Sequence, residues 1–222
     1  MKAEVNGIEL YYEVKGEGKP LIMIHGNGED HTIFDTAAEK LAGTYTCYLV
    51  DSRGHGQSTP AETLDYNVMA MDVLAFADVL GLDRPVYYGF SDGGIIGLIC
   101  AIKEPKRFER MIISGANIDP KGVKTWMYAL VKGMYLFTHD PKLKMMLEQP
   151  HIDVKELNTI KVKTLVLAGR KDLIREEHTL KIWKNIPGAQ IKLLEGEGHG
   201  SYIVHSDKIA DLILAFAEQG ER

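Results

Sequence analysis

The sequence predicts an α/β protein with a mostly parallel sheet, helices on both faces of that sheet, and an antiparallel hairpin at its start. Two observations carry this prediction. Short apolar runs alternate with helical patterns from residue 21 onward, except between residues 118 and 160. The dipeptide Asn6-Gly7 also separates two segments of alternating polarity, which is the pattern of a two-residue hairpin turn. The chain has 222 residues, 45% of them hydrophobic, so it can form one globular domain with a sheet covered on both faces.

The first third of the chain supplies the hairpin and the first parallel strands. Ala3–Val5 and Ile8–Val14 are expected to pair across the Asn6-Gly7 turn. Leu21–Ile24 is a continuous apolar run, which is typical of a parallel strand buried on both faces. Helical spacing follows at Ile33–Leu41, and a further strand is expected at Tyr45–Val50.

The rest of the chain continues this alternation. An amphipathic helix that ends at Gly81 is expected from the spacing of Val68, Met71, Leu74 and Leu80, with Val73, Phe76 and Ala77 alongside. The remaining expected elements are a strand at Pro85–Tyr88, an apolar helix from Asp92 that Pro105 stops, strands at Met111–Ser114, Lys161–Ala168 and Gln190–Leu194, and a closing helix from about Ser206 to Ala217.

Between residues 118 and 160 the alternation fails, because large apolar residues such as Trp126, Leu130 and Met134 recur at helical spacing. We therefore expect a core of residues 1–117 and 161–222 with a short helical insertion at 118–160. The insertion follows the carboxyl end of a strand, so it is expected to form a lid with an apolar wall over a site there. The alternative is an ordinary pair of surface helices packed on the sheet.

Composition excludes several classes of function. The formal net charge is −5 and the basic residues are scattered, so no nucleic-acid partner is expected. The start of the chain has no apolar signal core, and the longest apolar run, residues 93–102, is too short to span a bilayer. We therefore expect a cytoplasmic protein with no membrane partner. Cys47 and Cys100 lie in hydrophobic elements and are expected to be buried, with no disulfide or metal role.

Residues 86–97 carry the main functional signal, a β-branched and aromatic run followed by Gly-x-Ser-x-Gly and an apolar helical pattern. This order indicates a strand, a sharp turn and a helix, with Ser91 at the turn. Small neighbours are needed there, and Gly89, Gly93 and Gly94 supply them. Such a turn exposes a serine hydroxyl beside the free N–H groups of a helix start. Ser91 could then attack a carbonyl while the N–H of Asp92 binds the resulting oxyanion.

A serine nucleophile needs a histidine base, and that base needs a carboxylate to orient it. His199 is the expected base, because it follows a strand and glycines flank it. Asp172, just beyond the strand at 161–168, is the expected carboxylate, with Asp119 as the alternative. The remaining histidines are expected to have other roles: His25 and His55 hold loop backbone by hydrogen bonds, and His139, His151, His178 and His205 lie at the surface.

All three expected catalytic residues follow parallel strands, so their side chains should meet at one edge of the sheet. The loop after Ile24 reaches the same edge. The N–H of Asn27 in that loop can supply a second oxyanion donor, since Gly26 and Gly28 permit a close backbone approach.

These stretches together resemble the α/β-hydrolase superfamily over essentially the whole chain. The matching segments are His25-Gly26-Asn27-Gly28, residues 51–58, residues 89–94, residues 169–172 and Gly198-His199. The resemblance implies an α/β-hydrolase fold with Ser91 as nucleophile, His199 as general base and then acid, and Asp172 as its orienting carboxylate. It further implies an oxyanion hole made by the N–H groups of Asn27 and Asp92, with no metal and no organic cofactor.

The segment Gly89-Phe90-Ser91-Asp92-Gly93-Gly94 is most similar to the biphenyl hydrolase-like group, which includes the valacyclovirases, esterases that cleave amino-acyl esters. The resemblance therefore implies a carboxylesterase-type serine hydrolase whose partner is a small-molecule ester, with a preference for α-amino esters. The same superfamily contains perhydrolases, carbon–carbon bond hydrolases, acyltransferases and small-molecule receptors, and these remain alternatives.

Substrate contacts are expected from Phe90 and Asp92 at the turn and from Trp126 in the insertion. The Asp92 carboxylate has two alternative roles. About 5 Å from a substrate ammonium, it would attract that group by about 3 kcal/mol at an effective dielectric of about 20. Alternatively, it only complements the helix N-terminus, by about 0.3–1 kcal/mol, and points away from the site.

Overall fold

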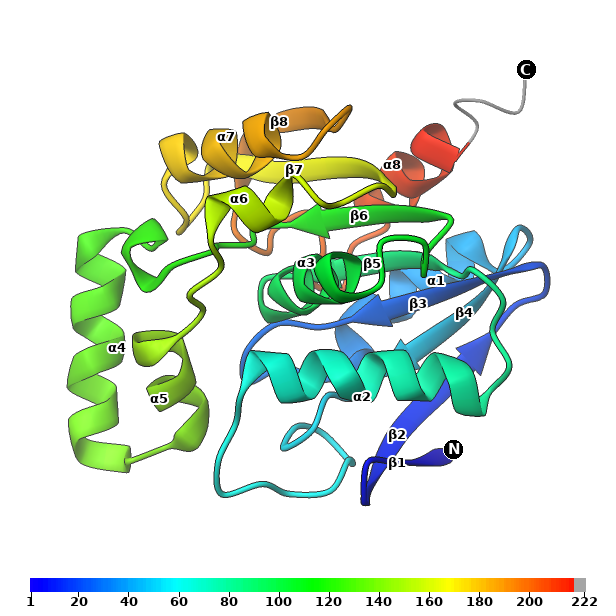
Figure 1. The fold of residues 1–222 in the computed structure, drawn as a ribbon, viewed down its shortest axis with the longest axis horizontal. Coiled ribbons are helices and arrows are strands. Elements are labelled where there is room, and N and C mark those ends of the chain that lie inside the picture. The colour runs from blue at the N-terminus through cyan, green and yellow to red at the C-terminus, as the bar shows by residue number, and fades with distance from the viewer. Residues whose placement is uncertain (218–222) are drawn as a thin grey trace.

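The computed structural model describes residues 1–217, which form a sheet flanked by helices on both faces (Figure 1). The strand order across the sheet is β1-β2-β4-β3-β5-β6-β7-β8. β1 pairs antiparallel with β2, and β2 with β4, whereas all later pairs are parallel. The strands are β1 (Lys2–Val5), β2 (Ile8–Lys15), β3 (Lys19–Ile24), β4 (Tyr45–Val50), β5 (Val86–Phe90), β6 (Arg110–Ser114), β7 (Lys163–Lys171) and β8 (Gln190–Gly198).

The predicted mostly parallel sheet with an N-terminal hairpin is therefore confirmed. Asn6 and Gly7 both have positive φ, at 47° and 78°, as the expected hairpin turn requires. Along the buried strands, side chains alternate between the two faces of the sheet. In β3, Ile22 and Ile24 belong to the hydrophobic cluster on one face, and Leu21 and Met23 to the cluster on the other.

Helices cover the two faces unequally. α1 (Asp35–Leu41), preceded by the short η1 (His31–Phe34), and α8 (Lys208–Ala217) pack on one face. The opposite face is covered by α2 (Tyr66–Val79), α3 (Asp92–Lys103), α6 (Val154–Leu157) and α7 (Glu176–Asn185). This arrangement confirms the prediction of helices on both faces.

Several local predictions differ from the structure. Val68 and Met71, expected on the buried side of α2, are 44% and 46% exposed. Of the other expected residues, Leu74, Val73 and Phe76 are buried, and Met69 joins them on the inward side of α2 because apolar residues occur around most of this helix. The helix α7 had no counterpart in the prediction, since it is largely polar and buries only Thr179 and Ile182.

Residues between β6 and β7 form the helical part that the sequence predicts as an insertion. It contains η2 (Pro120–Gly122), α4 (Thr125–Thr138) and α5 (Pro141–Glu148), followed by α6. In Figure 1, α4 stands at the edge of the molecule, with α5 between it and the body. Only Val131 of α4 and Met145 of α5 are fully buried, so this part packs loosely compared with the sheet. Its role as a lid remains a prediction.

Candidate active site

Ser91 occupies a strained turn between β5 and α3. Its φ and ψ are 52° and −110°, and its N–H donates to the Ser114 carbonyl over 2.8 Å. Two glycines allow the turn to be this tight. A Cβ added to Gly89 would overlap the Gly93 carbonyl, and one added to Gly93 would overlap the Ile24 carbonyl. The sequence therefore folds into the predicted turn because only glycine fits at either position.

The structure brings Ser91, His199 and Asp172 together in one hydrogen-bonded series. His199 Nε2 lies 3.1 Å from Ser91 Oγ, and His199 Nδ1 lies 2.6 Å from Asp172 Oδ1. Ser91 follows β5, Asp172 follows β7 and His199 follows β8, so three strand ends position the series. Gly115 makes room for the ring, since a Cβ there would lie 2.7 Å from His199 Cε1.

Burial and a backbone hydrogen bond fix the Asp172 carboxylate in its contact with His199. It is 2% exposed, and its Oδ1 also accepts from the Ile174 N–H over 2.9 Å. With the proton on Nδ1, the imidazole presents a basic Nε2 to the Ser91 hydroxyl. The alternative carboxylate, Asp119, instead accepts from the Lys121 N–H at the start of η2. It has no contact with His199 among the described residues.

The loop after β3 lies directly against Ser91. A Cβ on Gly26 would be 3.0 Å from Ser91 Cβ, so the backbone of this loop approaches the hydroxyl closely. The next N–H is that of Asn27, and the N–H of Asp92 begins α3 on the other side. Within the described chain, neither group has a hydrogen-bond acceptor in the surrounding loops, whereas the neighbouring Gly93 N–H donates to the His25 carbonyl. Both N–H groups are thus available to a ligand beside Ser91.

A cavity of about 180 Å³ opens beside Ser91. Its wall combines polar groups with apolar side chains from the helical part and from the loop after β7, including Met127, Met146 and Ile174. Phe90 lines it as well, with its ring centroid 4.9 Å from that of His199. Trp126, expected to contact substrate, is not on the cavity wall. It is 59% exposed, and the adjacent Met127 faces the cavity instead.

The Asp92 carboxylate is turned toward other residues of this cavity wall. It is 4% exposed, the Tyr66 hydroxyl donates to its Oδ1 over 2.6 Å, and the Asn27 side-chain amide donates to its Oδ2 over 2.9 Å. Burial raises the pKa of Asp92, and the two hydrogen bonds act in the opposite direction. Asp92 therefore lines the cavity, and the alternative in which it points away from the site does not hold.

Glu29 is a second acidic residue of the cavity wall, and the sequence analysis missed it. Its Oε2 accepts from the Gly26 N–H over 3.0 Å. A Cβ on Gly26 would lie 2.7 Å from this oxygen and 3.0 Å from Ser91 Cβ, so both side chains meet over the same glycine. Burial raises the pKa of Glu29. The available signal was its place two residues after Asn27, in the loop expected to frame the site.

The comparison with protein families matches residues 19–140 to the family described as alpha/beta hydrolase fold. The chain belongs to the α/β-hydrolase fold family. Two curated relatives align along nearly the whole of this α/β hydrolase. It is 29% identical to AB hydrolase superfamily protein YisY of Bacillus subtilis, over 95% of this chain and 96% of that protein. It is 25% identical to Serine hydrolase BPHL of Mus musculus, over 98% of this chain and 86% of that protein.

The similarity to BPHL confirms the resemblance to the biphenyl hydrolase-like group. Among solved structures, the enol-lactonase from Burkholderia xenovorans LB400 superposes with a TM-score of 0.84. The alignment covers 99% of this chain and all of that chain, at 22% sequence identity, and supports the shared fold. This protein is therefore a hydrolase by family.

Two buried histidines hold the loops of this α/β hydrolase, as expected. His25 Nδ1 donates to the Gly26 carbonyl over 2.7 Å, and its Nε2 accepts from the Ser52 N–H over 3.0 Å. Burial lowers the pKa of His25 to about 4, which fits this neutral ring. The His55 ring contacts the Arg53 carbonyl. The expectation of a surface role for His178 is wrong, since this half-buried ring accepts from the Ile118 N–H.

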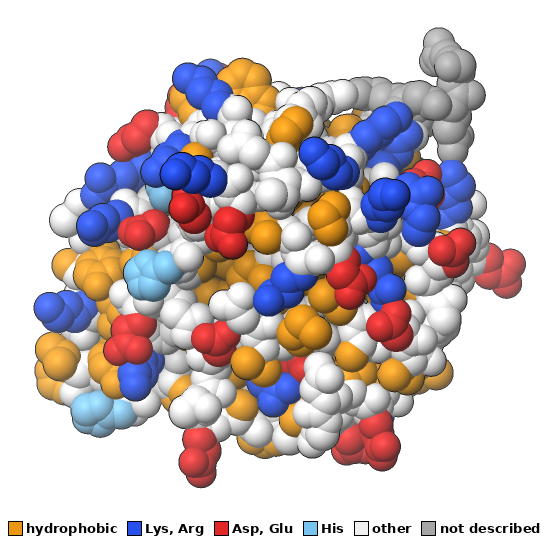
Figure 2. Space-filling view, in the orientation of Figure 1, with side chains coloured by type: hydrophobic (Ala, Val, Ile, Leu, Met, Phe, Trp, Pro, Cys, Tyr) orange, Lys and Arg blue, Asp and Glu red, His pale blue; other side chains and the backbone are white. Residues whose placement is uncertain are grey.

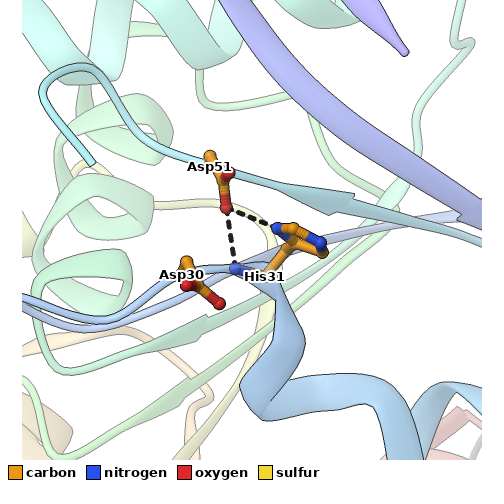
Figure 3. Close-up of side chains that lie close together, drawn as sticks. All are labelled: Asp30, His31 and Asp51. Atoms are coloured by element: carbon orange, nitrogen blue, oxygen red, sulfur yellow. Dashed lines mark hydrogen bonds and ion pairs between the residues drawn. The ribbon is translucent and has the colours of Figure 1, made fainter. Parts of the chain in front are cut away.

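A further cluster contains the half-buried Asp30 and the buried His31 and Asp51, and it connects two loops near the site (Figure 3). Asp51 Oδ1 accepts from both the His31 N–H and the His31 ring, each over 2.8 Å, and its Oδ2 accepts from the Gln57 N–H. Asp30 accepts from the Thr32 N–H at the start of η1. Because N–H donors occupy both Asp51 oxygens, the cluster joins the loop after β3 to the loop after β4.

Proposed function

We propose that this α/β hydrolase cleaves carboxylic esters of small molecules through an acyl-enzyme on Ser91, with a preference for α-amino esters. The observation that carries the proposal is the hydrogen-bonded series Ser91–His199–Asp172, with Ser91 at the start of α3. This combination provides an activated hydroxyl and N–H donors at one point, which is what acyl transfer requires.

The reaction follows from these contacts. Ser91 Oγ attacks the ester carbonyl while His199 Nε2 accepts the hydroxyl proton. The tetrahedral oxyanion receives hydrogen bonds from the N–H groups of Asn27 and Asp92. As the bond to the leaving alcohol breaks, His199 returns the proton to the alkoxide oxygen and the acyl group stays on Ser91. Water then attacks this acyl group with His199 again as the base, so the acid is released and Ser91 recovers its proton. None of these steps uses a metal or an organic cofactor.

Asp172 acts through His199 in this proposal. Its short contact with Nδ1 keeps the ring in the tautomer that leaves Nε2 basic, and it stabilises the imidazolium formed after proton transfer. Its burial keeps water from competing for that contact.

The proposed preference for α-amino esters rests on the charge of the cavity wall. Glu29 and Asp92 both line it together with Ser91, and no lysine or arginine does so among the described residues. A negative charge near a developing oxyanion opposes its formation, by up to about 3 kcal/mol at about 5 Å and an effective dielectric of about 20. A substrate ammonium between the carboxylates and the reacting carbonyl would compensate for this repulsion.

The first experiment compares the wild type with Ser91→Ala on p-nitrophenyl acetate, butyrate and octanoate and on an α-amino ester of matched size. We expect turnover by the wild type and a loss of at least about three orders of magnitude in the variant. A fluorophosphonate probe should also label the wild type at Ser91 and leave Ser91→Ala unlabelled. Undiminished ester turnover by a folded Ser91→Ala variant would refute the proposed nucleophile.

A further inference from the structure

The outer face of α4 exposes large hydrophobic side chains to solvent. Phe137 is 89% exposed, Leu136 62%, Trp126 59%, Leu130 51% and Met134 47%. We call these five residues the α4 face. Figure 2 shows hydrophobic side chains together with lysine or arginine side chains at the edge of the molecule where α4 lies. Exposed apolar residues gathered on one helix indicate an interaction surface, whereas single ones do not.

Helical spacing places four of these residues in one row along α4, with Leu136 beside it. Trp126, Leu130, Met134 and Phe137 follow one another at intervals of three or four residues, so they form a continuous row. Next to this row on the helix surface, Val131 is buried and Met127 lines the cavity beside Ser91. The apolar outer row is therefore not needed for packing the helix onto the protein.

The charges around the α4 face differ in sign from those of the whole chain. The chain has a formal net charge of −5, yet Asp140 is the only acidic residue between residues 121 and 147. Among the described residues, none of the lysines of this segment forms an ion pair within the protein. These lysines are Lys121, Lys124, Lys132, Lys142 and Lys144.

We propose that the α4 face docks on an anionic lipid bilayer. Tryptophan, phenylalanine and leucine on one side of a helix, flanked by lysines, fit the boundary between lipid headgroups and acyl chains. A second copy of this chain is a poorer occupant, because it would bring two sets of unpaired lysines together. The described residues contain no helix long and apolar enough to cross a membrane. Docking on the bilayer surface requires no such helix. The proposal therefore replaces the expectation that the protein has no membrane partner, and it leaves unchanged the expectation that no segment spans a bilayer.

Docking would bring the candidate active site close to the bilayer. The helix that carries the α4 face also contributes Met127 to the cavity wall, and α5 behind it contributes Met146. The bilayer would therefore contact the helical part that covers Ser91. This inference is independent of the proposed ester chemistry, because it concerns binding alone.

The test is cosedimentation with vesicles of phosphatidylcholine alone and of phosphatidylcholine mixed equally with phosphatidylglycerol. We expect binding to the mixed vesicles, and a decrease of at least about tenfold in the binding constant for Phe137→Ser. Lys132→Gln should lower the binding constant for the mixed vesicles by about fivefold. Val79→Ser is the matched control, since Val79 is also 59% exposed but lies at the end of α2. Ser91→Ala should bind like the wild type, which separates this result from the ester proposal.

Tryptophan fluorescence provides a second readout that does not depend on a change in stability. Trp126 is exposed, whereas Trp183 is half-buried and donates to the Ala189 carbonyl. Mixed vesicles should shift the emission of the wild type to shorter wavelength, and Trp126→Phe should remove the shift while retaining binding. The proposal would be overturned by equal binding to both kinds of vesicle or by no binding to either. It would also be overturned if the protein self-associates and Phe137→Ser abolishes that self-association.

Discussion

Replacing Glu29 by glutamine tests the origin of the proposed substrate preference. The Glu29 carboxylate accepts from the Gly26 N–H over 3.0 Å, and the side-chain carbonyl of glutamine can accept the same hydrogen bond. Glu29→Gln therefore removes one negative charge from the cavity wall while retaining the loop that holds the Asn27 N–H. Asp92→Asn is less informative, because its amide would face the donor groups of Tyr66 or Asn27.

The expected size of the effect follows from Coulomb's law. A carboxylate about 6 Å from a substrate ammonium attracts it by about 0.7 kcal/mol at the dielectric of water and by about 3 kcal/mol at about 20. Glu29 is half-buried, so we expect a value between these limits, which corresponds to a loss of about 3- to 100-fold in kcat/KM. The carboxylate is charged only above its pKa, which burial raises. The preference should therefore decline as the pH falls through a value above the usual range of glutamate.

The assay compares p-nitrophenyl 2-aminobutyrate with p-nitrophenyl butyrate, two esters that differ only in the amino group. Glu29→Gln should lower kcat/KM for the amino ester and leave the butyrate value unchanged or raised. Asp83→Asn is the control, since it removes a charge from an exposed residue at the opposite end of β5. An equal decrease for both esters, or no decrease for either, would refute the argument from cavity charge.

Three further outcomes follow from single contacts. Asp172→Asn should reduce kcat for p-nitrophenyl butyrate by about three to four orders of magnitude with the fold retained, because an amide does not fix the same His199 tautomer. Near-normal turnover by this variant would contradict the role of Asp172 in orienting His199. Tyr66→Phe removes a hydrogen bond to the buried Asp92, so the free energy of unfolding measured in urea should fall by about 1.5–3 kcal/mol. An unchanged urea midpoint would contradict this expectation. Burial lowers the pKa of His25 from 6.5 to about 4, so the unfolded state binds more protons between these values and the free energy of unfolding should fall as the pH decreases. His25→Gln should flatten this dependence, and an identical pH profile in the variant would assign it to other groups.

Residues at strand ends were predictable because local sequence determines their place. Gly89 and Gly93 allow a tight turn after a β-branched strand, and parallel strands bring their carboxyl ends to one edge. Once Ser91, Asp172 and His199 are assigned to three such ends, their approach follows from topology. The order of the strands accounts for the approach of His199 to Ser91, whereas Asp119 also follows a strand and only the structure places Asp172 against His199.

Contacts made by loop side chains could not be predicted in the same way. Glu29 faces the cavity because its loop bends back on the Gly26 N–H, and His31 is buried because the Asp51 carboxylate reaches it from another loop. Both arrangements depend on pairings between segments that have no regular period. A polar residue in such a loop has no pattern that distinguishes a buried position from an exposed one.

In α4, the sequence did not indicate which side of the helix faces the protein. This explains why Trp126 was expected in the cavity, and it also bears on the proposed bilayer contact. A helix that packs on one side and faces water on the other reveals its inward side by polarity. In α4, apolar residues occupy both sides, since Met127 and Val131 face the protein while Trp126 and Phe137 face outward. The sequence therefore gave no means of choosing between Trp126 and Met127 as the cavity residue. A helix with two apolar sides is favoured when each side has a partner, and here the described residues of the protein supply only one of them.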